Sequence, residues 1–225
     1  MHVHGKSVRA PADHIELAPI RAVYQGIAGA FGEEAVRLVW DGRAKAIPAR
    51  SFDAALEQLV DGRVEWAVIP VWNSTIGPVT AACAALSARG SSITVTRELE
   101  LPVRHCLLTV PGTSISDVRY VGSHAAALAQ CAGFFAEHPE LTACEAFDTA
   151  GAARELSMFR EPDGPRVADS WYAALRVDTP SRLAVIASAN AGRRYGLSIL
   201  LEGVQDDATN LTRFVVVRAA EPRTW

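Results

Sequence analysis

The chain has 225 residues, of which 49% are hydrophobic and 21% are charged, a balance typical of a globular protein with one large core or two smaller ones. The net charge of −3 and the lack of any Lys/Arg run argue against nucleic acid as a partner. No apolar stretch approaches the roughly 20 residues that span a bilayer, and residues 1–19 lack the apolar centre of a secretion signal. We therefore expect a cytoplasmic protein with a flexible tail at 1–19 and no membrane partner.

Cysteine spacing gives no sign of a metal or disulfide framework. Cys83, Cys106, Cys131 and Cys144 are far apart, and none belongs to a C-x-x-C pair. Zinc sites usually contain such pairs, and disulfide frameworks belong to secreted chains. We expect no metal site.

The first hundred residues alternate strand-like and helix-like segments. Residues 66–71 form a nearly continuous apolar run, as a strand buried on both faces requires. Residues 92–99 alternate between apolar and polar, as in an edge strand. The expected strands are 21–25, 45–51, 66–71 and 92–99, and the expected helices are 33–40, 52–59 and 79–88.

The pattern restarts near residue 100. Expected strands follow at 101–110, 118–123, 140–146, 183–188 and 211–217, expected helices at 124–138, 148–159 and 190–196, and an irregular excursion with one short helix at 160–182. Repeated β-α units predict parallel sheets with helices on both faces. The restart predicts an α/β fold of two lobes with a central cleft, similar to the type II periplasmic-binding-protein architecture. The first lobe takes 20–99 plus 197–220, and the second takes 100–196.

Ligands of open α/β sheets bind at the loops beyond the carboxyl ends of strands. The first distinctive loop, 25–34, places Gly26, Gly29 and Gly32 three residues apart before a helix. Glycine lets backbone N–H groups approach an anion at a helix N-terminus. The spacing matches neither G-x-G-x-x-G nor a P-loop, and two glutamates follow. An anion-binding loop and a plain tight turn both remain open.

Two further loops carry polar side chains. Asn73, Ser74 and Thr75 follow the apolar strand, where they either cap the next helix or contact a ligand. Ser123 and His124 lie at another strand-to-helix junction, and a histidine there either titrates near neutrality or is exposed at a helix start.

The last segment of interest is "NLTRFVVV". Thr212 and Arg213 point to opposite sides of an expected strand, and Phe214 returns to the first side. A hydroxyl and a fixed cation at a sheet edge suit a small anionic substrate. An ordinary surface arginine on an edge strand is the other interpretation.

Six blocks in consistent order over residues 21–218 resemble the prephenate dehydratase family. The blocks are "VYQGIAGAFGEEA", "AVIPVWNSTIGPV", "LPVRHCLL", "GSHAAALAQC", "LAVIAS…YGL" and "VQDDATNLTRF". The resemblance implies two α/β lobes with the active site between them. It also implies the conversion of prephenate to phenylpyruvate, water and CO₂ in phenylalanine biosynthesis, without a cofactor, by a homodimer.

The resemblance also implies roles for individual residues. Thr212 matches the family's essential hydroxyl, and Arg213 is its charge partner, so both are candidate catalytic residues. The candidate substrate-binding residues are Asn73, Ser74, Thr75, Ser123, His124, Phe214, Gly29 and Ala30.

Several positions depart from the family pattern. Trp72 stands where the family has Glu, Ala30 replaces Thr, Gly32 replaces Ser, Ile27 replaces Pro, and Ala125 replaces the Pro after Ser-His. We also expect no C-terminal ACT domain. These departures leave two alternatives open: a non-aromatising prephenate decarboxylase of secondary metabolism, and a non-catalytic paralogue that binds a small anion.

Overall fold

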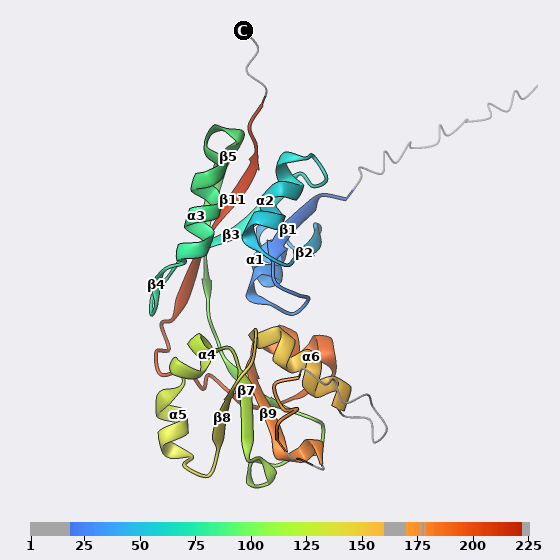
Figure 1. Ribbon diagram of the computed structural model, residues 1–225, viewed down its shortest axis with the longest axis vertical. Helices are drawn as coiled ribbons and strands as arrows, with labels where there is room; N and C mark the ends of the chain where they lie inside the picture. Colours follow the sequence, from blue (N-terminus) through green and yellow to red (C-terminus); the bar gives the residue numbers. More distant parts are fainter. Residues whose placement is uncertain (1–18, 160–169, 176, 178, 222–225) are drawn as a thin grey trace, which may run out of the picture.

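The computed structural model describes residues 19–159, 170–175, 177 and 179–221. Two α/β lobes lie one above the other, and the chain crosses between them twice (Figure 1). The expected α/β fold with two lobes is confirmed. The predicted tail falls almost entirely outside the described residues, as do 160–169, 176 and 178 of the expected excursion. No described helix is long and apolar enough to cross a membrane.

The first lobe contains a six-stranded sheet. Its strands are β1 (Arg21–Gln25), β2 (Lys45–Ala49), β3 (Trp66–Asn73), β4 (Gly77–Pro78), β5 (Ile93–Pro102) and β11 (Leu211–Ala219). They are ordered β2-β1-β3-β11-β5, and β4 pairs with β3. Its helices are α1 (Phe31–Val39), α2 (Phe52–Val60) and α3 (Thr80–Arg89), and a 3-10 turn, η1 (Gly90–Ser92), follows.

Strand alternation divides the core of this lobe between the two faces of the sheet. Ile69 and Val215 pack with α2 and α3, whereas Val68 and Phe214 pack with α1. Successive side chains of a strand point to opposite faces, so a residue's place in β3 or β11 decides which face it serves. Phe214 therefore lies on the α1 face.

The second lobe contains a five-stranded sheet ordered β10-β6-β9-β7-β8. Its strands are β6 (Cys106–Thr109), β7 (Tyr120–Ser123), β8 (Thr142–Glu145), β9 (Leu183–Ala187) and β10 (Ser198–Glu202). Its helices are α4 (Ala125–Ala129), α5 (Ala132–Glu137), α6 (Thr149–Phe159) and α7 (Ala189–Tyr195), with 3-10 turns η2 (Ile115–Asp117) and η3 (Pro180–Arg182). The expected short helix of the excursion is, in its described part, a turn followed by η3.

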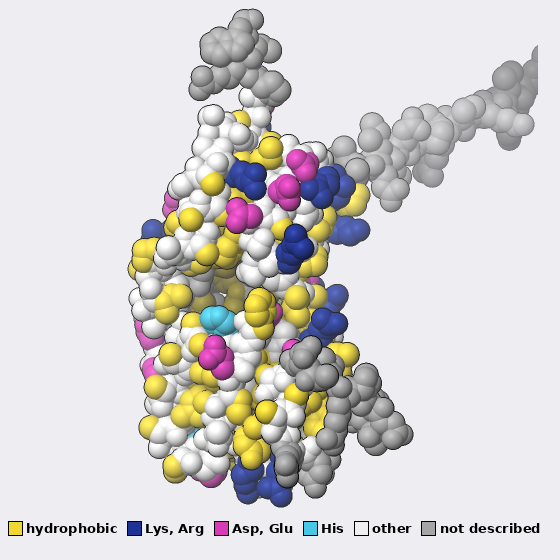
Figure 2. Space-filling view, viewed as in Figure 1, with side chains coloured by type: hydrophobic (Ala, Val, Ile, Leu, Met, Phe, Trp, Pro, Cys, Tyr) yellow, Lys and Arg dark blue, Asp and Glu magenta, His cyan; other side chains and the backbone are white. Residues whose placement is uncertain are grey.

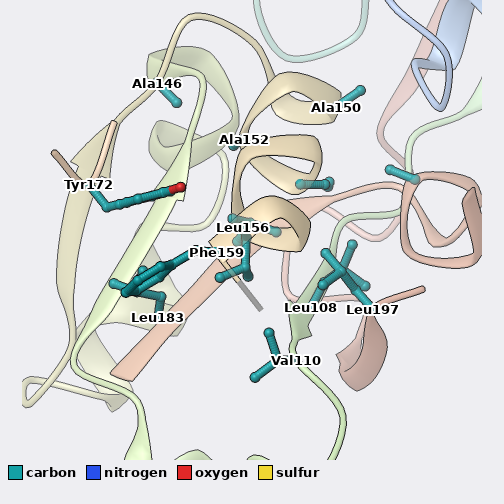
Figure 3. Close-up of a cluster of buried hydrophobic side chains, with 14 of the residues drawn as sticks. Leu108, Val110, Ala146, Ala150, Ala152, Leu156, Phe159, Tyr172, Leu183 and Leu197 are labelled. Carbon is teal, nitrogen blue, oxygen red and sulfur yellow. The ribbon is translucent and has the colours of Figure 1, made fainter. Parts of the chain in front are cut away.

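Aromatic residues of the excursion complete the core of the second lobe. The ring of Tyr172 stacks on Phe159 with centroids 5.2 Å apart, and Figure 3 shows Phe159 beside Leu183 in the cluster under α6. The indole of Trp171 lies so close to Gly122 that a Cβ on Gly122 would approach it to 2.5 Å. The described part of 160–182 thus covers one face of β7.

Four sequence-based expectations about the fold are wrong. The sheets are mixed rather than parallel, because β11 runs antiparallel to β3 and β5, and β6 runs antiparallel to β9 and β10. β10 pairs with β6 in the second sheet, so the first lobe does not resume at residue 197. The expected strand 101–110 is interrupted because residues 103–105 form the crossing between lobes, and the expected helix 124–138 divides into α4 and α5.

The lobes are joined on two sides. The crossing segments 103–105 and 203–210 bond to each other through Val103 N to Asn210 O at 2.8 Å and Gly203 N to His105 O at 2.9 Å. A second set of contacts, which we call the clasp, joins the loop before α1 to α7. In the clasp Ser188 Oγ donates to Gly29 O at 2.9 Å, and Tyr195 OH donates to Ala28 O at 2.6 Å. The space between the lobes is thereby bounded on two sides.

Candidate active site

A cavity of about 300 Å³ lies between the two lobes, and Figure 2 shows the surface hollowed there, with hydrophobic side chains inside the hollow. Its polar lining comes from both lobes and from the first crossing segment. The polar side chains are Gln25, Asn73, His105, His124, Gln130, Asp148, Thr149 and Thr212. The apolar lining includes Phe31, Phe52 and Phe214. Such a mixed cavity suits a small molecule with an apolar ring and a few polar groups.

Thr212 and Asn73 lie side by side in this cavity because β11 pairs with β3 in a register that places them opposite each other. Asn73 Nδ2 donates to Thr212 Oγ1 at 3.0 Å and to Leu211 O at 2.9 Å. A hydroxyl that accepts from an amide keeps its own proton for another acceptor. Thr212 is therefore held as a hydrogen-bond donor towards whatever fills the cavity.

The polar turn after Asn73 holds the asparagine rather than lining the cavity. Asn73 Oδ1 accepts from the backbone N–H groups of Thr75 and Ile76 at 3.0 and 3.2 Å. Ser74 Oγ accepts from Leu211 N at 3.0 Å. The side chains of Ser74 and Thr75 are exposed and lie outside the cavity lining.

A chain of buried amides connects Thr212 to the second lobe. Asn73 Nδ2 also donates to Asn210 Oδ1 at 2.8 Å, and Asn210 Nδ2 donates to Gln130 Oε1 at 2.9 Å. The same Gln130 oxygen lies 2.9 Å from His105 Nε2. One glutamine thus holds together a residue from each crossing segment.

The environment of His105 favours the neutral imidazole. Its side chain is buried against Phe31, with ring centroids 5.8 Å apart. Burial lowers the pKa of the imidazole, and the hydrogen bond to Gln130 opposes that effect only in part. Because the Gln130 oxygen can only accept, Nε2 carries the proton, and Nδ1 is buried without a partner among the described residues.

Arg213 does not line the cavity. It follows Thr212 on β11 and therefore faces the other side of the sheet, where Nη2 bonds to Glu100 Oε1 at 3.1 Å. The guanidinium also lies over the indole of Trp72, 5.5 Å from the ring centroid. The residue that stands where the family has Glu is thus a neighbour of Arg213, and neither is in the cavity lining.

Ser123 and His124 separate in the structure. Ser123 is fully buried, and its hydroxyl donates to Ile186 O at 2.6 Å, which ties β7 to β9. His124 lines the cavity and caps α4, since its Nδ1 accepts from Ala126 N at 3.2 Å. Of the pair, only the histidine reaches the candidate site.

The glycine-rich loop serves both the clasp and the cavity. Gly29 has φ +92°, and its carbonyl oxygen accepts from Ser188 Oγ in the clasp. Gly29 does not line the cavity. Ala30 and Gly32 line the cavity. A Cβ on Gly32 would lie 3.0 Å from Tyr24, so the smaller residue fits where the family has Ser. The Glu33 carboxylate accepts from Gly29 N, so it stabilises the turn.

Sequence reasoning missed several cavity residues, among them Gln130, His105 and Asp148. Gln130 and His105 lie in the blocks "GSHAAALAQC" and "LPVRHCLL", so their position in those blocks was the available signal. Asp148 is the first residue of the expected helix 148–159 and belongs to none of the six blocks. Its Oδ1 accepts from Gly151 N at 2.5 Å, and it is also the one charged side chain in the described cavity lining.

The described residues contain no group of three His, Cys, Asp or Glu side chains able to hold a metal ion. The chemistry that the described lining offers is therefore hydrogen bonding from Thr212, amides and imidazoles around an apolar ring site.

Comparison with known proteins agrees with this geometry. The family model described as prephenate dehydratase matches residues 22–222. The chain is 34% identical over 203 residues to arogenate dehydratase/prephenate dehydratase 2 of Arabidopsis thaliana, covering 90% of this chain and 47% of that protein. It is 35% identical over 204 residues to arogenate dehydratase 1 of Petunia hybrida, covering 90% of this chain and 43% of that protein.

Solved structures give the same fold. Prephenate dehydratase from Arthrobacter aurescens, in complex with L-Phe, has a TM-score of 0.75 and 28% identity over 90% of this chain and 61% of that one. GqqA, described as a novel type of quorum-quenching acylase, has a TM-score of 0.72 and 30% identity over 91% of this chain and 65% of that one. This chain spans about half the length of the curated relatives that it matches. The match over residues 22–222 shows that the chain belongs to the prephenate dehydratase family.

Proposed function

We propose that this chain converts prephenate to phenylpyruvate, water and CO₂. The observation that supports this most directly is the Thr212 hydroxyl, which lines the interlobe cavity and accepts from Asn73, so its proton is available to a substrate oxygen. Several relatives carry the names arogenate dehydratase or prephenate dehydratase.

The reaction needs one well-placed donor. The ring carboxylate leaves as CO₂, and its bonding pair enters the ring. The bond between the ring and its hydroxyl oxygen breaks, and that oxygen takes its bonding pair and a proton to leave as water. Thr212 donates a hydrogen bond to the departing oxygen, which stabilises the charge that develops there. Phe31 and Phe214 provide an apolar wall for the aromatic ring that forms.

The same donor weighs against the two alternatives. A non-aromatising decarboxylase keeps the ring hydroxyl and has no use for a proton donor beside it. A non-catalytic binding protein likewise has no use for a hydroxyl whose proton is free for a leaving group. The proposal also includes the cytoplasmic homodimer expected from the sequence, which light scattering and cell fractionation test.

The deciding experiment is incubation of the purified protein with prephenate at neutral pH, with separation of products against a control without enzyme. Enzyme-dependent phenylpyruvate supports the dehydratase. A decarboxylated product that retains the ring hydroxyl overturns it in favour of the non-aromatising reaction. Bound, unchanged prephenate would indicate the non-catalytic alternative.

A further inference from the structure

We propose that Asp148 makes this cavity selective for arogenate, the amino counterpart of prephenate, whose side chain carries an ammonium group in place of the keto oxygen. This inference rests on the proposed function, because it concerns the same site and the same leaving groups. It assigns Asp148 as the residue that distinguishes the two acids.

Asp148 is positioned by the start of α6. It precedes the first residue of the helix, and its Oδ1 accepts from Gly151 N at 2.5 Å as a helix cap does. That bond fixes the carboxyl group at the cavity wall. No described residue donates to Asp148 Oδ2 by a side chain or backbone group. The carboxylate therefore has an acceptor oxygen available to a ligand in the cavity.

The charge of the described cavity lining determines which ligand group Asp148 Oδ2 would favour. Asp148 is the one charged side chain among the described lining residues, and Arg213, the cation that the sequence proposed for the site, is paired with Glu100 on the opposite face of the sheet. A ligand therefore meets one negative side chain and no positive one in the described lining. Placing an ammonium group there is favourable, and placing another oxygen acceptor beside the carboxylate is unfavourable.

Size cannot make the distinction. Prephenate and arogenate contain the same number of non-hydrogen atoms and share the ring, the ring hydroxyl and both carboxylates. They differ where a carbonyl oxygen, which only accepts, is replaced by an ammonium, which donates and carries a positive charge. A cavity of about 300 Å³ holds either acid equally well. Discrimination must come from a group that distinguishes a donor from an acceptor, and a carboxylate does so.

The test is the specificity ratio, defined as kcat/KM for arogenate divided by kcat/KM for prephenate, in the wild-type protein and in Asp148→Asn. We expect a wild-type ratio of at least about 10, since hydrogen bonds to charged groups change affinity by about 10- to 100-fold. The variant should lower the ratio about tenfold or more, by losing arogenate activity and gaining prephenate activity. Asparagine caps helices as well as aspartate does, so α6 should remain intact.

Glu145→Gln provides a matched control. Glu145 is an exposed residue of β8, outside the cavity lining, and this change removes the same charge three residues away. Its specificity ratio should equal that of the wild type. Asp148→Ser, which also caps a helix without a charge, should reproduce the effect of Asp148→Asn.

The inference fails if the wild type prefers prephenate, or if the ratio is the same in the wild type and in Asp148→Asn. Failure of the proposed function is distinguishable, because prephenate would then yield no phenylpyruvate, whatever the outcome with arogenate. If neither acid yields an aromatic product, the binding of phenylalanine and of phenylpyruvate, measured calorimetrically, decides the matter. Selective loss of phenylalanine affinity in Asp148→Asn supports the inference, and equal affinities in both proteins overturn it.

Discussion

The side chain of Asn73 organises more of the candidate site than any other single residue described. Its amide nitrogen donates to Asn210, Leu211 and Thr212, and its amide oxygen accepts from two backbone N–H groups of the following turn. An amide that is fixed at both ends cannot flip without breaking all these bonds. Asn73 therefore occupies an acceptor site of the Thr212 hydroxyl and leaves its proton free for another acceptor.

Thr212→Ala removes the proposed donor while leaving β11 in place. We expect turnover to fall by about 10²- to 10⁴-fold, the usual contribution of a positioned proton donor. Thr212→Ser keeps the hydroxyl and should retain most of the activity. Steady-state kinetics of both variants tests this, with an unchanged thermal unfolding transition as evidence that each variant is folded. Near wild-type turnover in Thr212→Ala would remove Thr212 from the mechanism.

Buried His105 makes stability depend on pH. Its pKa in the folded protein is lowered from 6.5 by burial, so the unfolded chain binds a proton more readily than the folded chain does. The stabilising contribution is complete above about pH 6.5 and is lost as the pH falls below that value towards the folded pKa. Urea unfolding at about pH 7.5 and about pH 5.5 should show this loss.

His105→Gln should make the free energy of unfolding less sensitive to acid over that interval. An equal pH dependence in wild type and His105→Gln would contradict the assignment.

Individual residues differ in how far the sequence predicts their positions. Thr212 and Phe214 share the cavity face as strand alternation requires. Arg213 lies on the other face for the same reason, and its charge partner comes from β5, a pairing that spacing alone does not reveal. Ser123 is internal because β9 presents a carbonyl to it. The alternation of a strand predicts on which face of the sheet a side chain lies, but the residue that it contacts there depends on the tertiary fold.

Four of the described α-helices begin with side-chain caps. Ser51, His124, Asp148 and Ser188 accept from backbone N–H groups in the first turns of α2, α4, α6 and α7. The caps at α4 and α7 bring polar groups to the cavity and to the clasp. Residues that local sequence favours as helix caps thus also contribute to the candidate site.

Ala125→Pro should stabilise α4. Ala125 is the first residue of the helix, where the N–H has no partner within the helix and proline is favoured. His124 already has φ −62° and ψ 142°, which suits a residue before proline. We expect a gain of about 0.4–1 kcal/mol in the free energy of unfolding.

Ala126→Pro is the matched comparison, because it removes the N–H that donates to His124 Nδ1. That variant should be destabilised. A thermal midpoint for Ala125→Pro that falls together with that of Ala126→Pro would contradict the assignment of the helix start.

Periodicity predicted most of the described elements because their apolar faces are continuous. β10 was missed: its five residues are mostly exposed at a sheet edge and carry no buried pattern. The break between α4 and α5 falls where Gln130 turns towards the cavity, and the apolar repeat continues through it. Local pattern does not encode an interruption that tertiary contacts impose.

At the scale of the whole molecule, the cavity exists only because two lobes are held together. The crossing segments close one side, and the clasp closes the other. The restart near residue 100 predicted two lobes. It did not predict the clasp, whose donors and acceptors lie more than 150 residues apart along the chain.

Ligand binding should therefore protect both crossing segments together. In Thr212→Ala saturated with prephenate, we expect slower amide hydrogen exchange at Val103, Gly203 and Val204, whose N–H groups bridge the two segments. At a ligand concentration of 100 times Kd the added protection is up to about 2.7 kcal/mol. Amide hydrogens of α3 that exchange by local opening serve as the internal reference, and their exchange rate should not change when the ligand binds. Protection confined to one lobe would contradict binding between the lobes.

The position of β11 also constrains the order of biosynthesis. β11 lies between β3 and β5 in the first sheet, although the whole second sheet is translated before it. While the ribosome makes β6 to β10, the nascent first lobe has an open slot beside the edge of apolar β3 that later pairs with β11. Such edges readily pair with other chains. A chain released before Leu211 would thus have a complete second lobe and an aggregation-prone first one.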